Sequence, residues 1–376
     1  MPMNRIQAER IWEDFHDRKM VILGGPRQVG KTTLSRQIAT RFKNPLYLNF
    51  DHPEDRERIR KRDWKKSNDL LIFDEIHKWR IWKSWLKGIY DKEGGEHRIL
   101  VTGSARLDVY RKGGDSMQGR YHYWRLHPFT YSEILQVTHS NKNVLQNLFT
   151  RGGFPEPYLA TSERALKRWQ RERLERVIRE DVFALESIRN LNALFYLHEL
   201  LVERVGSPIS LKSLGEDLGV SPITVGHWIQ ILESMYVIFI VAPYHKKLTR
   251  AIRKEYKVYL YDWSLIRENG LRWENMIASH LLRYCHFQED SEGDRMQLCF
   301  LKDRDDHEAD FLLVRDGKPI HLVEAKLTVS QLSRGLLYFS RKLNMKQTSQ
   351  VVFNFEGIKE GRDADIISGG DFLEKL

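Results

Sequence analysis

The sequence has only two cysteines, Cys285 and Cys299, among its 376 residues. They lack the paired spacing of a zinc site and are too few for a disulfide framework, so we expect a reducing compartment. No apolar run approaches the roughly 20 residues that a membrane-spanning helix needs, and the first residues, MPMNRIQAERIWEDF, are charged throughout. These absences predict a soluble, cytoplasmic protein without a membrane partner.

The composition otherwise indicates a folded protein. Hydrophobic residues make up 41% of the chain and ten residues are Trp, which excludes a largely disordered polypeptide. At roughly 100 to 200 residues per domain, the length leaves room for two or three domains. Lys and Arg total 61 against 51 Asp and Glu, a formal charge of +10 that favours polyanionic partners but identifies none.

A glycine-rich loop, GGPRQVGKTT at 24–33, directly follows an apolar strand expected at 19–23. Such a loop lets successive N–H groups converge on phosphates at the positive end of the next helix, which Leu34, Ile38 and Phe42 mark by their spacing. Lys31 is expected to bridge the β- and γ-phosphates, and the Thr32 hydroxyl to bind Mg²⁺. A chance glycine-rich turn is the alternative. The pattern predicts an ATP site made of Gly25, Pro26, Arg27, Gln28, Val29, Gly30, Lys31, Thr32 and Thr33.

A second apolar run, LLIFDE at 70–75, ends in two acids. Such a run suits a central parallel strand, and ligands bind at the carboxyl edge of parallel sheets. We expect Asp74 to bind Mg²⁺ and Glu75 to orient the attacking water. The alternative is that both acids are only solvated at a strand end.

Two further features are candidates for the ATPase reaction. A strand expected at 98–101 ends in Thr102-Gly103-Ser104, where Ser104, or else Thr102, is placed to sense the γ-phosphate; capping of the next turn explains these hydroxyls equally well. Arg120, after Gly119, is a candidate arginine finger in its own site or in that of a neighbouring copy. The alternative is a solvated surface arginine. A finger in trans requires self-association, so a homo-oligomer stays open.

These motifs resemble a group of bacterial and archaeal AAA+ ATPases whose C-terminal part is a domain of unknown function. The resemblance spans nearly the whole chain. It implies an AAA+-type parallel sheet, ATP and Mg²⁺ as ligands, ATP hydrolysis, and a nuclease-like C-terminal domain. It rests on GGPRQVGKTTL, LLIFDEIH, ILVTGSA, Gly119-Arg120, LHPFTYSEI from Leu126 and RGGFPEPYL from Arg151.

The middle region predicts a connecting helix and then a winged helix. Over 162–190, arginines and lysines flank one apolar face, which fits a solvated helix or a polyanion contact. Over 209–225, Gly219, Ser221 and Pro222 suit the turn, cap and first position between two helices. Strands expected at 236–241 and 257–261 form the wing. DNA binding and protein packing both suit such a module. Between the strands lie Lys246, Lys247, Arg250, Arg253 and Lys254, which favour phosphate contacts.

The C-terminal region has a second group of carboxylates. Segments 308–314 and 320–326 flank the turn RDGK and predict a hairpin. Because side chains alternate along a strand, Glu324 and Lys326 share a face that Asp310 can join. In a restriction-endonuclease-like core, Asp310, Glu324 and Glu274 would bind Mg²⁺ and Lys326 would activate water or stabilise phosphate charge. Acid-x-Lys triplets are common by chance, so a non-catalytic scaffold is the alternative.

The sequence therefore predicts an α/β multidomain protein. Its parts are an AAA+-like P-loop ATPase domain at 1–160, a helical connector with a winged helix at 161–262, and a restriction-endonuclease-like domain at 263–376. The expected function is ATP hydrolysis coupled to a nuclease-like module that acts on DNA or RNA. The alternative is an ATP-dependent switch that acts on a protein partner, with the C-terminal domain as a scaffold.

Overall fold

The computed structural model describes residues 5–17, 19–93, 95–104, 117, 119–138, 143–160, 162–182, 191–244, 256–329 and 331–376. The chain divides into two compact units. The first consists of Met1–Pro128, Glu172–Ile188 and Ser234–Tyr236, and the second of Phe129–Arg171, Arg189–Glu233 and Val237–Leu376. The three-domain division at 160 and 262 stays a prediction. No helix in the described part of the chain combines the length and apolar character needed to cross a bilayer.

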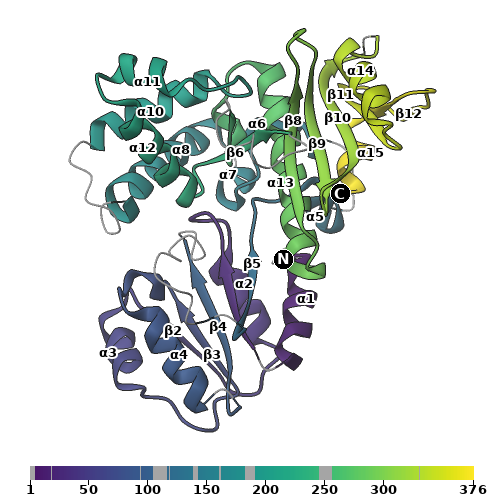
Figure 1. The fold of residues 1–376 in the computed structure, drawn as a ribbon. Coiled ribbons are helices and arrows are strands. Elements are labelled where there is room, and N and C mark those ends of the chain that lie inside the picture. Colours follow the sequence, from purple (N-terminus) through teal and green to yellow (C-terminus); the bar gives the residue numbers. More distant parts are fainter. Residues whose placement is uncertain are drawn as a thin grey trace. The chain divides into compact units, whose positions relative to one another are not determined.

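The first unit is built on a five-stranded sheet with the order β2-β3-β4-β1-β5, in which every pair is parallel (Figure 1). The strands expected at 19–23, 70–75 and 98–101 are confirmed as β1, β3 and β4. The strands are β1 Met20–Gly24, β2 Pro45–Asn49, β3 Leu70–Asp74, β4 Arg98–Gly103 and β5 Tyr121–Arg125. Helix α1 Gln7–Asp14 precedes β1, and the helices between the strands include α2 Lys31–Ala39, α3 Pro53–Lys61 and α4 Trp82–Glu93.

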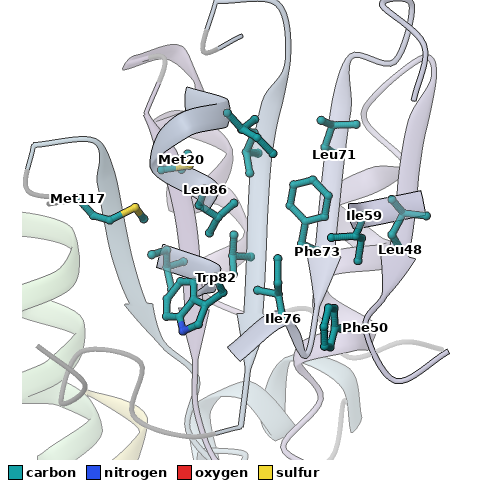
Figure 2. Packing of buried hydrophobic residues seen from close by; sticks show 14 residues of the cluster. Met20, Leu48, Phe50, Ile59, Leu71, Phe73, Ile76, Trp82, Leu86 and Met117 are labelled. Atoms are coloured by element: carbon teal, nitrogen blue, oxygen red, sulfur yellow. The ribbon is translucent and has the colours of Figure 1, made fainter. Parts of the chain in front are cut away.

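The core of this unit explains why its strands are apolar runs. All five residues of β1 and of β3 are buried, as expected where a parallel sheet is covered on both faces. Figure 2 shows Phe73 of β3 among apolar side chains of neighbouring elements, including Ile59 of α3 and Leu86 of α4. Because the strands are parallel, β1, β3 and β4 all end at one edge of the sheet, and the loops that follow them meet there.

The second unit is built on an eight-stranded mixed sheet with the order β12-β13-β11-β10-β9-β8-β6-β7. Its strands are β6 Ile238–Pro243, β7 Lys257–Leu260, β8 Met296–Lys302, β9 Glu308–Arg315, β10 Lys318–Thr328, β11 Thr348–Asn354, β12 Ile358–Lys359 and β13 Asp365–Ser368. Its helices include α5 Tyr131–Thr138, α6 Val144–Arg151, α7 Pro155–Leu159, α10 Leu191–Glu203, α11 Leu211–Leu218, α12 Pro222–Ser234, α13 Asn269–Glu292, α14 Arg334–Leu343 and α15 Gly369–Glu374.

The predicted C-terminal hairpin is confirmed as the antiparallel pair β9–β10. Its two central residues, Asp316 and Gly317, have φ of 50° and 77°. Positive φ at both positions is the signature of a type I′ turn, whose twist matches that of the flanking strands. The turn, together with a register shift between Pro319 and His321, sets the pairing that carries Asp310 and Glu324 on adjacent strands.

The helices expected at 209–225 are confirmed as α11 and α12. Ser210 caps α11, Gly219 ends it at φ 66°, and the Ser221 hydroxyl accepts a hydrogen bond from Thr224 N at the start of α12. The two expected wing strands are the antiparallel pair β6–β7. Because β6 also pairs with β8, both strands belong to the eight-stranded sheet. The winged helix as a module stays a prediction, and the basic run at 246–254 lies outside the described residues.

The connecting helix begins at Glu163 and continues to Arg176 as α8, followed by a π-helix over Val177–Val182. Of the apolar face expected there, Trp169, Val177 and Ile178 are buried. The remainder of the expected helix, 183–190, lies outside the described residues. The π-helix belongs to the same compact unit as the glycine-rich loop.

Candidate functional site

The glycine-rich loop leaves β1 at Gly24 and enters α2 at Lys31. Gly25 has φ 154° and Gly30 has φ 101°, conformations that favour glycine. A Cβ on Gly25 would also lie 2.4 Å from the carbonyl oxygen of Leu126, so no larger residue fits there. Within the loop, Gln28 Oε1 is buried without a hydrogen-bond partner among the described residues. A cradle of this kind fits an anionic ligand.

The ammonium group of Lys31 is buried against the loop. Its Nζ donates to the carbonyl oxygens of Gly25 and Pro26 at 2.9 and 2.8 Å. An unpaired buried ammonium is costly, so the loop's own carbonyls stabilise the lysine. Phosphate oxygens are stronger acceptors for the same donors because they carry charge. When a nucleotide binds, the ammonium group of Lys31 can therefore exchange the loop carbonyls for phosphate oxygens.

Asp74, at the end of β3, accepts hydrogen bonds from hydroxyl groups of three elements and is only 2% exposed. Its Oδ2 accepts from Thr32 at 2.8 Å and from Tyr47 at 2.5 Å, and its Oδ1 accepts from Thr102. Burial, reinforced by the hydrogen bond to Asp74, raises the pKa of Tyr47 and keeps the phenol protonated as a donor. The structure thus brings the predicted magnesium ligands Thr32 and Asp74 into contact.

Glu75 follows at the same edge of the sheet with φ 57°, in the left-handed region. Ser104 Oγ lies 3.5 Å from its Oε2, and Lys78 Nζ lies 3.6 Å from the same atom. His77 Nε2 is 3.8 Å away, but burial lowers the pKa of His77, so that ring is neutral near pH 7. Ser104 therefore contacts the predicted catalytic glutamate, whereas Thr102 contacts the predicted metal ligand.

Arg120 is not brought to this site within the chain. The parallel register pairs Met20 with Tyr121 and Gly24 with Arg125, which places Arg120 at the start of β5 and the loop at the other end of β1. Its Nε lies 2.8 Å from Oδ1 of Asp91 in α4. Action of Arg120 on its own site does not fit this placement, and its role as a finger in a neighbouring copy stays a prediction beside the alternative of an ordinary surface arginine.

Arg27 of the loop forms a contact that the sequence did not predict. Its guanidinium lies 2.8 Å from Oε2 of Glu180 in the π-helix. Both residues belong to the first unit. The loop is thereby linked to a segment some 150 residues further along the chain.

The second cluster lies in the other unit and joins all four residues predicted for it. Ala325 N donates to Asp310 Oδ2 at 2.9 Å, and Asp310 N donates to Glu324 Oε2 at 3.4 Å. Lys326 Nζ lies 2.9 Å from Glu324 Oε1. Glu274, on α13, is close enough to raise the pKa of Asp310 by its charge, after the larger effect of burial. Three carboxylates and one lysine therefore converge.

Sequence reasoning missed two members of this cluster, Lys257 and Tyr259 of β7. Tyr259 donates to Glu274 Oε1 at 2.7 Å, and Lys257 Nζ lies 2.6 Å from Glu308 Oε1. Burial lowers the pKa of Lys257, but nearby carboxylates, Glu274 first, outweigh burial, so its pKa is raised and the lysine stays charged. The available signal was a lysine in the fully buried strand KVYL, where an unpaired charge is unfavourable.

The cluster has the ligand chemistry that Mg²⁺ or Mn²⁺ requires. Burial raises the pKa of Asp310 and of Glu274, and the charge of neighbouring carboxylates adds to this effect, although Lys257 opposes it. Carboxylate oxygens are the ligands that hard divalent cations prefer. A metal-binding role for Asp310, Glu324 and Glu274 stays a prediction. In the described part of the chain, the group of three whose ligand atoms lie close enough together for one ion is Asp303, Asp305 and His307.

The second helix of the predicted winged helix, α12, carries no lysine or arginine in its sequence over Pro222–Ser234, PITVGHWIQILES. Phosphate contacts are made mainly by those residues. Exposed cations are present instead on α8, among them Arg164, Lys167, Arg168 and Arg171.

Three protein families match successive parts of the chain. An AAA domain family matches residues 17–135, a domain of unknown function (DUF8612) matches 142–274, and a second (DUF4143) matches 269–368. The chain is 24% identical over 385 residues to the uncharacterised protein MJ1544 of Methanocaldococcus jannaschii, covering 91% of this chain and 84% of that protein. It is also 24% identical over 317 residues to the uncharacterised protein Rv2008c of Mycobacterium tuberculosis, covering 77% and 70%.

Solved structures give weaker similarities. The Walker-type ATPase PABY2304 of Pyrococcus abyssi is 12% identical with a TM-score of 0.45, over 72% of this chain and 95% of that chain. A signal-transduction ATPase with a tetratricopeptide-repeat sensor, PH0952 of Pyrococcus horikoshii, is 14% identical with a TM-score of 0.30, over 76% and 48%. The family match, the strand-loop-helix and the parallel sheet together identify residues 17–135 as an AAA-type P-loop ATPase domain. Such domains bind nucleotide, usually with Mg²⁺.

Proposed function

We propose that the chain hydrolyses ATP at residues 25–33, with Asp74 and Glu75 completing the site, and that this ATPase is coupled to a metal-dependent nuclease module. The contact that carries the ATPase proposal is the 2.8 Å hydrogen bond from Thr32 to Asp74. It links the first turn of the loop's helix to the end of β3. In P-loop ATPases these are the two protein groups that hold the magnesium of bound ATP.

Each residue of the ATPase site has a separate task. The loop amides and Lys31 bind the phosphates, and Thr32 and Asp74 supply oxygens for the cation, which would neutralise charge on the β- and γ-phosphates when bound. Glu75 orients the attacking water and accepts its hydrogen bond. Ser104, 3.5 Å from Glu75, positions that carboxylate.

The decisive comparison is between Lys31→Ala and Glu75→Gln. Lys31 contacts charge already present in bound ATP, so its loss should weaken nucleotide binding by roughly tenfold or more. Glu75 acts on the water, so Glu75→Gln should bind ATP normally and hydrolyse it about a hundredfold more slowly. Glu57→Gln, an exposed acid of α3, is the matched control. Normal steady-state turnover by Glu75→Gln would remove the assignment.

A second activity is supported by the cluster in the other unit. Glu324 contacts both Lys326 and the backbone amide of Asp310, and the charge of Glu274, after the larger effect of burial, raises the pKa of Asp310. Two acids and a lysine on the paired strands β9 and β10 suit phosphodiester hydrolysis. The carboxylates would hold the cation, which stabilises charge at the scissile phosphate, and Lys326 would orient the water and stabilise developing charge.

The nuclease proposal is tested with Mg²⁺ or Mn²⁺ on DNA and RNA, each with and without ATP. Wild type should cut a substrate that Asp310→Ala and Lys326→Ala do not cut. Lys318→Ala is the matched control, because Lys318 lies on the same strand but at the exposed turn. Cleavage that survives both site variants would point to a contaminant. Inactive wild type on every substrate would indicate a non-catalytic scaffold.

Nucleic-acid binding is proposed to use the basic face of α8 and the basic run at 246–254, since α12 carries no lysine or arginine. Affinity should fall steeply as salt rises, because each phosphate contact releases counterions. A gel-shift titration over salt measures this. The absence of binding at low salt, combined with ATPase activity that responds only to a protein partner, would indicate the alternative switch function.

A further inference from the structure

Lys257 is the most deeply buried charge of the carboxylate cluster. Its side chain is 2% exposed, and its Nζ lies 2.6 Å from Glu308 Oε1 and 3.8 Å from Glu274 Oε1. The same ammonium group lies over the ring of Phe300, 5.3 Å from its centroid. Contact with solvent is therefore replaced by two carboxylates and an aromatic face. A lysine in such surroundings is fixed in place, because no other position would compensate its charge.

The Oε1 atom of Glu274, on the side that faces Lys257, already has close neighbours. It accepts the Tyr259 hydroxyl at 2.7 Å and lies 3.8 Å from Lys257. Gly206, with φ 73°, packs against the same carboxylate, and a Cβ at this position would lie 2.9 Å from Oε1. Glu274 is thus held by three groups on one side.

Asp310 and Glu324 are bound differently. Asp310 Oδ2 and Glu324 Oε2 accept backbone amides, and Glu324 Oε1 meets the half-exposed Lys326. Backbone amides fix the orientation of a carboxylate without adding a full positive charge. Lys326 pairs with Glu324 at 2.9 Å, but its side chain is 41% exposed and can turn into solvent, whereas Lys257 is buried and cannot. Asp310 and Glu324 therefore keep the greater capacity for a divalent ion.

We propose that Lys257 is a permanent internal cation of this cluster: it occupies the Glu274 side, where a second divalent ion would otherwise bind, so that Asp310 and Glu324 hold a single ion. The inference rests on the metal-dependent activity proposed above and specifies how many ions that site takes. Glu274 becomes a positioning residue, tied to Lys257 and Tyr259, where the sequence had suggested a metal ligand. Repulsion between an ammonium group and a divalent cation a few ångströms away supplies the selectivity.

The proposal is tested by calorimetric titration of the full chain with Mn²⁺. Wild type should bind one ion that is lost in Asp310→Ala. Lys257→Met removes the charge but keeps a long apolar side chain, and should bind Mn²⁺ about tenfold or more tightly, or take a second ion. Lys302→Met is the matched control: Lys302 contacts the same Glu308 at 3.5 Å but is 40% exposed, so its affinity should change less than about twofold.

Loss of Lys257 leaves buried carboxylates without their cation, so folding is checked by thermal denaturation. If Lys257→Met does not fold, the double variant Lys257→Met with Glu308→Gln removes one charge of each sign and receives the same titration. A folded variant with unchanged or weaker Mn²⁺ binding would overturn the proposal. So would a wild type that binds two ions sensitive to Asp310→Ala, or none.

Failure of the nuclease function is distinguishable from failure of this inference. The titration needs no substrate and no turnover. If wild type cuts no substrate but Lys257→Met binds Mn²⁺ more tightly than wild type does, the inference about Lys257 holds and the nuclease proposal fails. If wild type cuts nucleic acid but Lys257→Met binds Mn²⁺ no more tightly than wild type does, the nuclease proposal holds and the inference about Lys257 fails.

Discussion

Tyr47 donates a hydrogen bond of 2.5 Å to Asp74, to the same Oδ2 atom that accepts the Thr32 hydroxyl at 2.8 Å. Tyr47 lies on β2 and Asp74 on the neighbouring β3. Arg36 of α2 lies over the tyrosine ring, 5.0 Å from its centroid. The predicted magnesium ligand is therefore oriented by a phenol that is itself held by the helix of the glycine-rich loop.

We expect Tyr47→Phe to weaken the magnesium dependence of the ATPase. Removing the phenol deletes a hydrogen bond to a charged group, of the kind worth roughly 1.5 to 3 kcal/mol, and leaves Asp74 less well oriented. The Mg²⁺ concentration for half-maximal ATP hydrolysis should rise severalfold, with a smaller effect on binding of ATP without metal. Tyr90→Phe in α4 is the control. An unchanged Mg²⁺ titration would contradict a positioning role.

The ion pair between Arg27 and Glu180 should compete with nucleotide. Both side chains are partly exposed, and such pairs contribute at most about 1 kcal/mol. Glu180→Gln releases Arg27 towards the phosphates, so ATP affinity should rise by about two- to fivefold, whereas Arg27→Gln should lower it. Glu172→Gln, whose partner is Arg176, serves as the control. Binding of a fluorescent ATP analogue measures these shifts, and equal affinity in Glu180→Gln and wild type would remove the competition.

Arg120 should act on a neighbouring copy. We expect Arg120→Ala to lower turnover by about a hundredfold or more with little change in ATP affinity, because a finger stabilises charge that develops in the transition state. Mixing inactive Arg120→Ala with inactive Glu75→Gln should restore part of the activity, since each supplies what the other lacks. Arg60→Ala on α3 controls for the loss of a surface arginine. Mixtures as inactive as their components would reject action in trans.

His280 should make the second unit sensitive to acid. Its Nδ1 donates to Met276 O at 2.8 Å, and its Nε2 accepts the amide of Tyr131 at 3.2 Å, so the ring is neutral. Burial lowers the pKa of His280 to about 4, against about 6.5 when unfolded. The unfolded state alone binds the proton in this range, so stability present above pH 6.5 should fall by roughly 3 kcal/mol as pH drops to 4.

Chemical denaturation of the full chain at pH 7 and pH 5 checks this. The change in unfolding midpoint between the two pH values should be smaller in His280→Gln than in wild type, because the variant has no proton to bind there. His227→Gln on α12, where the histidine is exposed, should keep the wild-type change. An equal pH response in wild type and His280→Gln would show that other groups, such as buried His321, carry it.

The sequence by itself determined the features that depend on neighbours in the chain. Glycines at 25 and 30 permit the backbone turns of the loop, and the apolar runs of β1 and β3 require burial on both faces of a sheet. The Asp316-Gly317 pair specifies the tight hairpin, and Ser221 with Pro222 starts α12. These follow from local sterics, hydrogen bonding and periodicity, which act over a few residues.

The tertiary structure alone decided which distant side chains meet. Strand order set Tyr47 beside Asp74, and parallel register placed Arg120 at the opposite end of β1 from the loop, which no local pattern encodes. Lys257 joined the carboxylates because the pairing of β6 with both β7 and β8 drew its strand into the C-terminal sheet. A buried charge must find its partner wherever topology supplies one, so its role depends on contacts far apart in the sequence.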